Sequence, residues 1–122
     1  MSGISWIEYK GFRILYTDYG SSHEENVRLL EEQGTYEEND PDILIISDYN
    51  GTSASQEYMQ KVKEYGKKFR RNKDTNVKNA VLGISGVKKT LFESYLFFTY
   101  DGHTRLFNNE TEAKEWLISD QD

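Results

Sequence analysis

The chain has 122 residues, the length of one ordinary domain, and we expect residues 1–122 to fold as a single unit. Its 15 basic and 21 acidic residues give a net charge of −6, which argues against binding to the phosphate backbone of nucleic acids. The absence of cysteine excludes disulfides, thiolate metal sites and cysteine nucleophiles, while aromatic rings, 14% of all residues, supply much of the apolar mass.

The first two predicted elements form a β-hairpin. Ile4–Tyr9 and Phe12–Thr17 are both rich in β-branched and aromatic residues, a composition typical of strands. Lys10 and Gly11 lie between them and are typical of a tight turn, because glycine accepts the positive φ that short hairpin turns need. Two strands joined this way are expected to pair antiparallel.

After the hairpin, helical and strand segments alternate. The unbroken β-branched run Ile43–Ile46 is typical of a strand buried on both faces. Before this strand we expect a helix capped by Ser21 or Ser22, and after it a helix from about Ser53 to Phe69. A strand at Val77–Ile84, a helix at Val87–Tyr100 and a strand at Thr104–Phe107 are expected next. The final helix is expected to be capped by Asn109 or Thr111, with Ala113, Trp116 and Leu117 facing inward. Gly34 is expected to interrupt or end the first helix. The order ββαβαβαβα predicts an α/β fold with a single mixed, largely parallel, five-stranded sheet.

The sequence shows no sign of export or membrane insertion. Met1–Tyr9 has no basic stretch followed by a long apolar one, so no signal peptide is expected. The longest fully apolar run, Ile43–Ile46, is far shorter than the ~20 residues of a membrane span. We therefore expect a cytoplasmic protein without a transmembrane segment.

Three segments carry features of a known family. They are Tyr9–Asp18, with Tyr-Lys-Gly and Ile-Leu-Tyr-Thr-Asp, Leu82–Lys89, with Gly-Ile-Ser-Gly-Val-Lys-Lys, and Leu106–Leu117, with Phe-Asn-Asn-Glu-Thr-Glu-Ala. Together they resemble the SpoIIAA-like group of bacterial domains over nearly the whole chain. That group is similar in fold to STAS domains and to lipid-binding CRAL-TRIO domains, so the resemblance implies a SpoIIAA/STAS-like fold. It implies less about function, because one fold hosts many functions.

The first candidate site follows the buried β-branched run. In the STAS proteins that antagonise anti-sigma factors, a regulated serine follows an aspartate at a helix start, and the resemblance places Asp48, Thr52, Ser53 and Ser55 in the corresponding positions. In this chain Gly51 precedes the hydroxyl residues, whereas the familiar signature has its glycine after them. One functional interpretation is phosphorylation, which would add negative charge near Asp48. Another is that the loop binds a ligand. The alternative is that Thr52 or Ser53 only caps the helix.

The second candidate is the turn at Gly83–Lys89. The residues proposed to bind an anion are Gly83, Ser85, Gly86, Lys88 and Lys89. Its glycines allow close backbone approach, and its lysines lie in a first helical turn, where cations oppose the helix dipole unless an anion compensates them. The alternative is a tight turn with two solvated lysines. Together with the preceding loop, this turn is expected to border a crevice at the carboxyl ends of the strands, where α/β sheets bind ligands.

The third candidate is the segment Leu91–Tyr100, which is apolar almost all round in an otherwise polar chain. A helix of this kind is either buried on several sides or exposes an apolar patch. An exposed patch would mark an interface with a protein partner or a second copy of the chain, a membrane-surface contact or an apolar ligand pocket. The residues proposed for that interface are Phe92, Tyr95, Leu96 and Phe97.

No pattern indicates catalysis or a bound cofactor. His23 and His103 lie in separate predicted turns, and neither has a cysteine or a second histidine nearby at ligand spacing, so no metal is expected. The carboxylates occur in runs typical of solvated helix faces, and the basic run Lys67–Lys73 is typical of a helix C-terminus. The chain is therefore expected to be a non-enzymatic regulatory or protein-interaction domain. The alternative is a carrier or sensor of a small apolar or amphipathic anionic ligand, such as a lipid.

Overall fold

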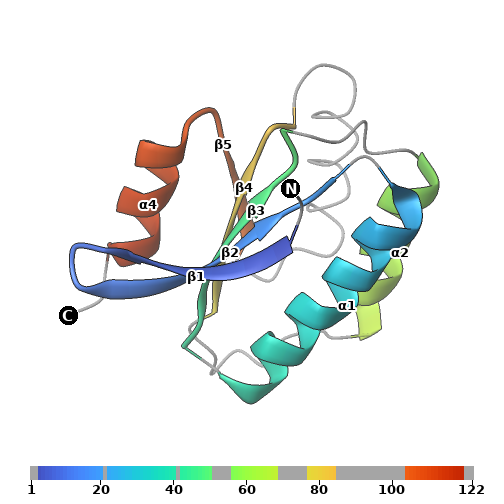
Figure 1. Cartoon of the computed structure of the whole chain (residues 1–122), viewed down its shortest axis with the longest axis horizontal. Coiled ribbons are helices and arrows are strands. Elements are labelled where there is room, and N and C mark those ends of the chain that lie inside the picture. The colour runs from blue at the N-terminus through green and yellow to red at the C-terminus, as the bar shows by residue number, and fades with distance from the viewer. Residues whose placement is uncertain are drawn as a thin grey trace.

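The structure, a computed structural model, describes residues 3–20, 22–40, 42–50, 56–68, 77–84 and 104–119. In chain order its elements are β1 (Gly3–Tyr9), β2 (Phe12–Asp18), α1 (His23–Asn39), β3 (Leu44–Asp48), α2 (Gln56–Lys68), β4 (Lys78–Leu82), β5 (Thr104–Phe107) and α4 (Glu110–Ile118) (Figure 1). Each of these lies where the sequence predicts an element of the same type. The helix predicted at Val87–Tyr100 lies outside the described residues.

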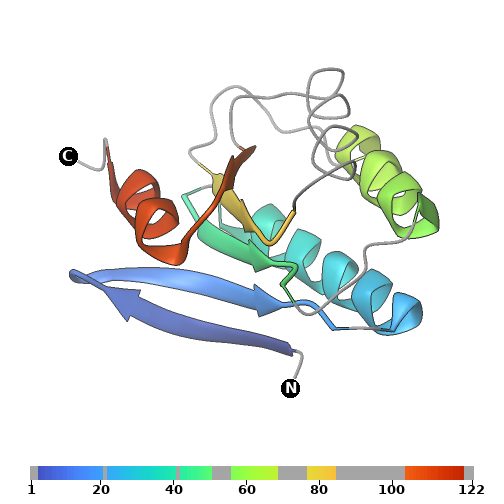
Figure 2. The same ribbon diagram turned by 90° about the horizontal axis from the view of Figure 1, so that it is seen from above.

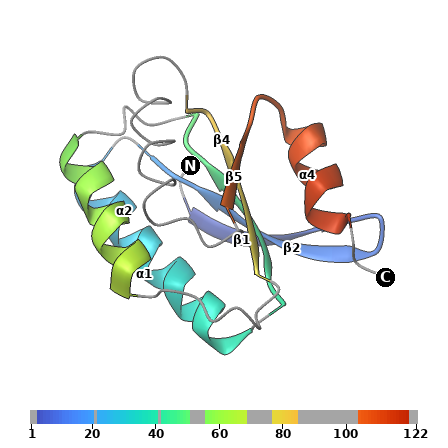
Figure 3. The same cartoon turned by 180° about the vertical axis from the view of Figure 1, so that it is seen from behind.

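The five strands form one sheet in the order β1-β2-β3-β4-β5. Only β1 and β2 pair antiparallel, and the other neighbours pair parallel, which confirms the predicted mixed, largely parallel sheet. Right-handed crossovers that step along the sheet in one direction leave their helices on one face. Accordingly α1 and α2 cover one face, and α4 covers the other (Figures 2 and 3).

The hairpin is closed by a two-residue turn. Lys10 has a φ of 49° and Gly11 a φ of 87°, the pair of positive values that defines a type I′ turn. This turn type matches the right-handed twist of the strands and sets the register in which Tyr9 pairs with Phe12. The carboxylate of Glu115 in α4 ties the turn down, because it accepts from the Tyr9 hydroxyl at 2.5 Å and from the Lys10 ammonium at 2.9 Å.

Side-chain caps begin two helices as the sequence predicts. The Ser22 hydroxyl accepts from the Glu25 N–H at the start of α1, and the Asn109 amide oxygen accepts from the Glu112 N–H at the start of α4. The prediction for Gly34 was wrong, because α1 continues through this buried glycine to Asn39. Packing of α1 against the sheet outweighs the roughly 1 kcal/mol by which glycine disfavours a helix.

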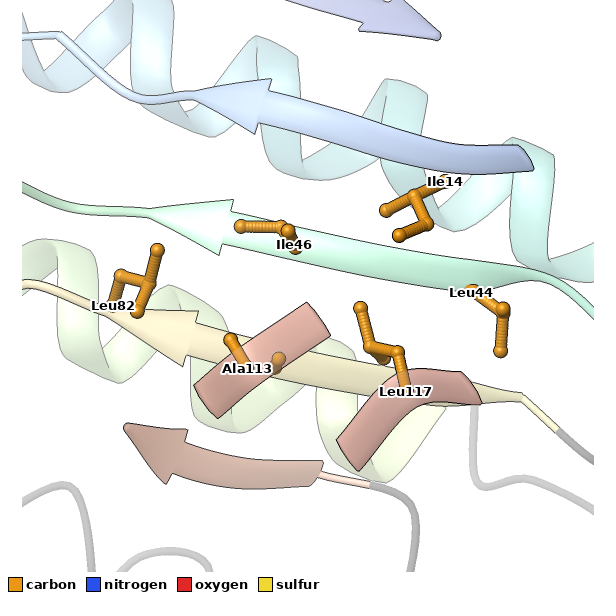
Figure 4. Close-up of a cluster of buried hydrophobic side chains, with 7 residues drawn as sticks. Ile14, Leu44, Ile46, Leu82, Ala113 and Leu117 are labelled. Atoms are coloured by element: carbon orange, nitrogen blue, oxygen red, sulfur yellow. The ribbon is translucent and has the colours of Figure 1, made fainter. Parts of the chain in front are cut away.

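The two faces of the sheet have different cores. On the α4 face the buried core residues are all aliphatic, and partly buried aromatic rings pack against them; the buried residues are Ile14, Leu44, Ile46, Ala80, Leu82, Ala113 and Leu117 (Figure 4). On the α1 and α2 face, aliphatic side chains such as Leu15 and Ile45 share the core with buried tyrosines and with buried Thr17, Gln33 and Ser47. Polar groups are therefore concentrated beneath α1, and the same face holds the cluster of buried tyrosines described below.

Candidate functional site

The carboxyl ends of β2, β3 and β4 lie side by side. The residue after β2 and the residue after β3 each donate to the last carbonyl of the next strand. The Tyr19 N–H donates to the Asp48 carbonyl at 2.9 Å, and the Tyr49 N–H donates to the Leu82 carbonyl at 2.8 Å. Asp48 and Gly83, which belong to the first and second predicted sites, thus lie at neighbouring strand ends.

Gly83 lets the end of β4 contact the start of the loop after β3. Its φ is +86°, and a Cβ atom at this position would lie 2.5 Å from the Asn50 nitrogen and 2.7 Å from the Tyr49 carbonyl carbon. This close approach explains the glycine without an anion. The described strand order does not reverse, so the sheet has no switch point to open a crevice here. The predicted crevice stays a prediction.

Most residues of the three predicted sites lie outside the described residues. They are Thr52, Ser53 and Ser55 of the first site, Ser85, Gly86, Lys88 and Lys89 of the second, and Phe92, Tyr95, Leu96 and Phe97 of the third. Their predicted roles stay predictions. The structure places only Asp48 and Gly83 of these sets, and it brings those two together.

Asp48 uses both carboxylate oxygens within the fold. Its Oδ1 accepts from the Asn50 N–H at 2.9 Å in an Asx turn, and its Oδ2 accepts a short hydrogen bond from the Tyr16 hydroxyl. Partial burial of the ring, followed by the hydrogen bond to Asp48, raises the pKa of Tyr16 above its usual value. Tyr16 therefore remains protonated and donates to Asp48 at neutral pH, which fixes this carboxylate at the head of the loop.

A buried tyrosine cluster lies on the face of the sheet that α1 and α2 cover. It consists of Tyr19, Tyr49 and Tyr58. The rings of Tyr19 and Tyr49 stack with their centroids 4.4 Å apart, and Tyr58 of α2 meets them edge-on at 6.0 and 5.8 Å. The hydroxyls of Tyr49 and Tyr58 are 2.9 Å apart, a hydrogen bond. Burial raises the pKa of all three phenols, that of Tyr49 to about 12, so the cluster is neutral at physiological pH.

A short repeat in the sequence marks the tyrosine cluster, although the predicted elements do not single it out. Thr17-Asp18-Tyr19 ends β2, and Ser47-Asp48-Tyr49 ends β3. The parallel register pairs the two hydroxyl residues and the two aspartates, so the tyrosines that follow stack on each other. A repeated hydroxyl residue, aspartate and tyrosine after two adjacent parallel strands is thus the signal from which the stack could be predicted.

Gln33 of α1 connects the tyrosine cluster to a buried polar row across the sheet. Its Oε1 accepts from the Tyr19 hydroxyl at 3.1 Å and lies 3.2 Å from the Ser47 hydroxyl, which is also 2.8 Å from Asn79 Oδ1. Thr17 is fully buried beside Ser47, and its hydroxyl has no hydrogen-bond partner among the described residues. These bonds fix α1 on the sheet, because every shift of the helix would leave a buried polar atom unpaired.

His23 begins α1, rather than lying in a turn as predicted. Its ring meets the Tyr58 ring edge-on at 6.4 Å, its Nε2 lies 3.7 Å from the Glu57 carboxylate, and its Nδ1 is buried without a hydrogen-bond partner. In the described ranges, no three His, Asp or Glu side chains are placed to hold a metal ion. Among the same residues, no helix has the length and apolar character needed to cross a membrane.

Trp6 is the only large hydrophobic side chain that is exposed among the described residues, at 39% of its surface. It lies in β1, the strand at one edge of the sheet (Figure 1), and two side chains contact its ring. The Arg13 guanidinium lies 4.2 Å from the centroid of the indole ring, and the Tyr36 ring of α1 meets it edge-on at 5.9 Å. We call Trp6, Arg13 and Tyr36 the Trp6 patch. Trp, Tyr and Arg are the residues enriched in binding hot spots.

The arrangement of these elements is similar to that of a solved protein. The crystal structure of an uncharacterised DUF3478-family protein from Shewanella loihica PV-4, which has a SpoIIAA-like fold, matches 94% of this chain and 92% of that chain. The TM-score is 0.65 and the sequence identity is 16%. This chain has a SpoIIAA-like fold. No protein-family model matches it, and no curated protein matches its sequence.

The SpoIIAA-like fold confirms the resemblance drawn from the sequence segments. Two of those segments, Tyr9–Asp18 and Leu106–Leu117, lie in the described part of the chain as the hairpin and as β5 followed by α4. At this level of identity the likeness shows the fold alone, and a SpoIIAA-like fold does not determine an activity. The function therefore has to follow from the tyrosine cluster and the Trp6 patch of this chain.

Proposed function

We propose that this chain is a non-enzymatic protein-interaction or regulatory domain that binds its partner through the Trp6 patch and the outer edge of β1. The observation that carries the proposal is the exposure of Trp6 in a strand at the edge of the sheet. An exposed indole forgoes about 2 kcal/mol or more of burial free energy, which a partner protein would supply.

The contacts around Trp6 favour binding over simple exposure. Arg13 and Tyr36 hold the indole ring in one orientation before a partner arrives. A side chain that is already ordered loses little conformational entropy on binding, so more of the contact free energy appears as affinity. This pre-organisation distinguishes Trp6 from an apolar side chain that is merely left in solvent.

In the same proposal, the tyrosine cluster has a structural role. Its phenols are buried and bonded to one another or to Gln33, so they lack the access to a substrate that acid–base catalysis requires. Asp48 is held by Tyr16 and by the Asx turn. The regulatory part of the proposal rests on the resemblance, in which phosphorylation of Ser53 or Ser55 after Asp48 would alter a partner surface. The carrier alternative gains no specific support from the described residues.

Site-specific photo-crosslinking in the cells that make the protein tests this proposal. The photoreactive amino acid p-benzoylphenylalanine replaces Trp6 in one variant. In a matched control it replaces Trp116 of α4, whose ring packs against Phe107 of β5. We expect a protein adduct from position 6 that is absent from position 116. Equal adducts from both positions, or none from position 6, would contradict the proposal.

A further inference from the structure

We infer that the partner of the β1 edge is a second copy of this chain, and that the two β1 strands pair antiparallel about a two-fold axis through Trp6. The inference rests on the proposed function, because it names the partner of the same surface. It follows from the direction of the backbone groups in β1, from their symmetry about Trp6 and from the composition of the strand.

The hairpin turn determines which backbone groups of β1 are open. A two-residue type I′ turn closes on a hydrogen-bonded pair, here Tyr9 and Phe12, and such pairs alternate along an antiparallel ladder. Ile7 and Ser5 therefore bond to β2. The N–H and C=O groups of Glu8, Trp6 and Ile4 point away from β2 toward the outer edge, where no described strand pairs with them.

These outward groups match those of a second β1 strand. A two-fold axis through Trp6 places Trp6 opposite its own copy and Ile4 opposite Glu8 of the copy. Each outward N–H then meets an outward C=O, and all three residues of each strand are paired. Within the described strand, an axis through Ser5 would leave Glu8 unpaired, and an axis through Ile7 would leave Ile4 unpaired. The strand is thus most fully satisfied by an antiparallel copy of itself.

The side chains agree with the same axis. Opposed tryptophans form one of the aromatic cross-strand pairs that stabilise sheets, and the single charge of β1, Glu8, faces an isoleucine instead of another glutamate. A parallel, in-register copy would place the two Glu8 carboxylates beside each other. Because the antiparallel contact uses the same surface on both copies, it closes as a dimer and does not propagate.

The composition of β1 leaves this edge open to pairing. Sheet edges are commonly protected by short strands, lysine, proline or bulges. β1 has seven residues, pairs with β2 without a bulge and contains neither lysine nor proline. At the other edge of the sheet, β5 has only four residues and carries Arg105. The sheet is therefore protected unequally, and the less protected edge is the one that carries Trp6.

Two substitutions of one residue test the inference in the full-length purified chain. The Glu8 N–H points outward, so Glu8→Pro removes a donor to the second copy and leaves the ladder to β2 intact. Glu8→Ala removes the same carboxylate but keeps the N–H. By sedimentation velocity over a wide range of concentration, we expect a dimer for the natural chain and for Glu8→Ala. Glu8→Pro loses a hydrogen bond at both symmetric positions, so its dimer should be weaker by about tenfold or more.

A second variant keeps the test decisive if Glu8→Pro does not retain the circular dichroism spectrum of the natural chain. Trp6→Lys places two ammonium groups opposite each other at the axis and is expected to give a folded monomer. A natural chain that stays monomeric, or a dimer that survives Trp6→Lys, would overturn the inference. If the chain is monomeric but position 6 still crosslinks to a different protein in cells, only this inference fails. If neither is seen, the proposed function fails as well.

Discussion

The carboxyl ends of the central strands and the outer edge of β1 differ in how far their polar groups are satisfied. At the strand ends the Tyr16 and Asp48 side chains bond to each other, and the tyrosine cluster bonds internally and to Gln33. At the β1 edge, alternate backbone groups and much of the Trp6 ring have no partner in the described structure. Aromatic residues are concentrated in both regions, but only the β1 edge has backbone groups and ring surface left to contact a partner.

This difference teaches that an aromatic cluster in a polar chain is not by itself a binding site. Stacked and mutually bonded rings stabilise the fold, whereas a ring held in place but exposed offers contact area. Changes at the strand ends should therefore alter stability and leave association unchanged. Changes at the β1 edge should do the reverse.

The largest effect should come from alkaline pH, which tests whether the tyrosine cluster is structural. The folded-state pKa of each phenol lies above that of the unfolded chain, near 10, so the contribution of the cluster to stability is fully present below about pH 10 and is lost as pH rises through the folded values. Each phenol that only the unfolded chain ionises lowers stability by about 1.4 kcal/mol per pH unit. The phenolate absorbance of three of the nine tyrosines should therefore appear only when the circular dichroism of the fold is lost. Ionisation of all nine tyrosines while the fold persists would show that the cluster is accessible.

Gly83→Ala should produce the next largest loss. The new Cβ would require a strained backbone at φ +86° and would overlap the Asn50 nitrogen, so we expect destabilisation by about 3 kcal/mol in urea unfolding. As a matched control, Gly11→Ala adds only the φ penalty, because no atom lies within 4 Å of its Cβ position, and should be milder by about half. Equal losses would show that the contact between the strand ends is unimportant.

Asp48→Asn should have a smaller effect on stability and none on the dimer. The amide keeps the shape of the carboxylate but has one acceptor oxygen instead of two and no charge, so it cannot accept from both the Asn50 N–H and the Tyr16 hydroxyl, for an expected loss of about 1 kcal/mol. Because the carboxylate contributes to the raised pKa of Tyr16, that pKa should fall toward its usual value. Urea unfolding measures the first effect and sedimentation velocity the second. A change in association would place Asp48 at the interface.

Thr17→Val should change stability in the opposite direction. The substitution preserves shape and removes a buried hydroxyl that has no hydrogen-bond partner, so we expect a gain of up to about 1 kcal/mol in urea unfolding. Ser47→Ala is the matched control on the adjacent strand, because its hydroxyl is bonded, and should lose about 1 kcal/mol. A loss for Thr17→Val would mean that the hydroxyl is satisfied.

The sequence predicts the fold well where local signals decide it. The Lys10-Gly11 turn, the cap at Asn109 and the β-branched run at Ile43–Ile46 act through neighbouring residues, and all three are confirmed. The tyrosine cluster depends on strand register, and the continuation of α1 through Gly34 depends on packing. Both are set by contacts between residues far apart in the chain, so patterns within single segments do not specify them.

The exposure of Trp6 illustrates the same limit for the candidate site. In the sequence, Trp6 is one ring in an alternating strand, like Tyr9 or Phe12. Its exposure follows from the position of β1 at the edge of the sheet, which the order of elements alone does not determine. The sequence directs attention instead to the segment 91–100, which lies outside the described residues.

Amide hydrogen exchange along β1 tests the central claim, pairing of this edge with a second copy, most directly. The N–H groups of Ser5 and Ile7 point toward β2 and serve as internal controls, because they should be protected at every protein concentration. The N–H groups of Ile4, Trp6 and Glu8 point outward, and their protection should rise with concentration as the dimer forms. Fast exchange at these three positions, unchanged between dilute and concentrated protein, would contradict the account.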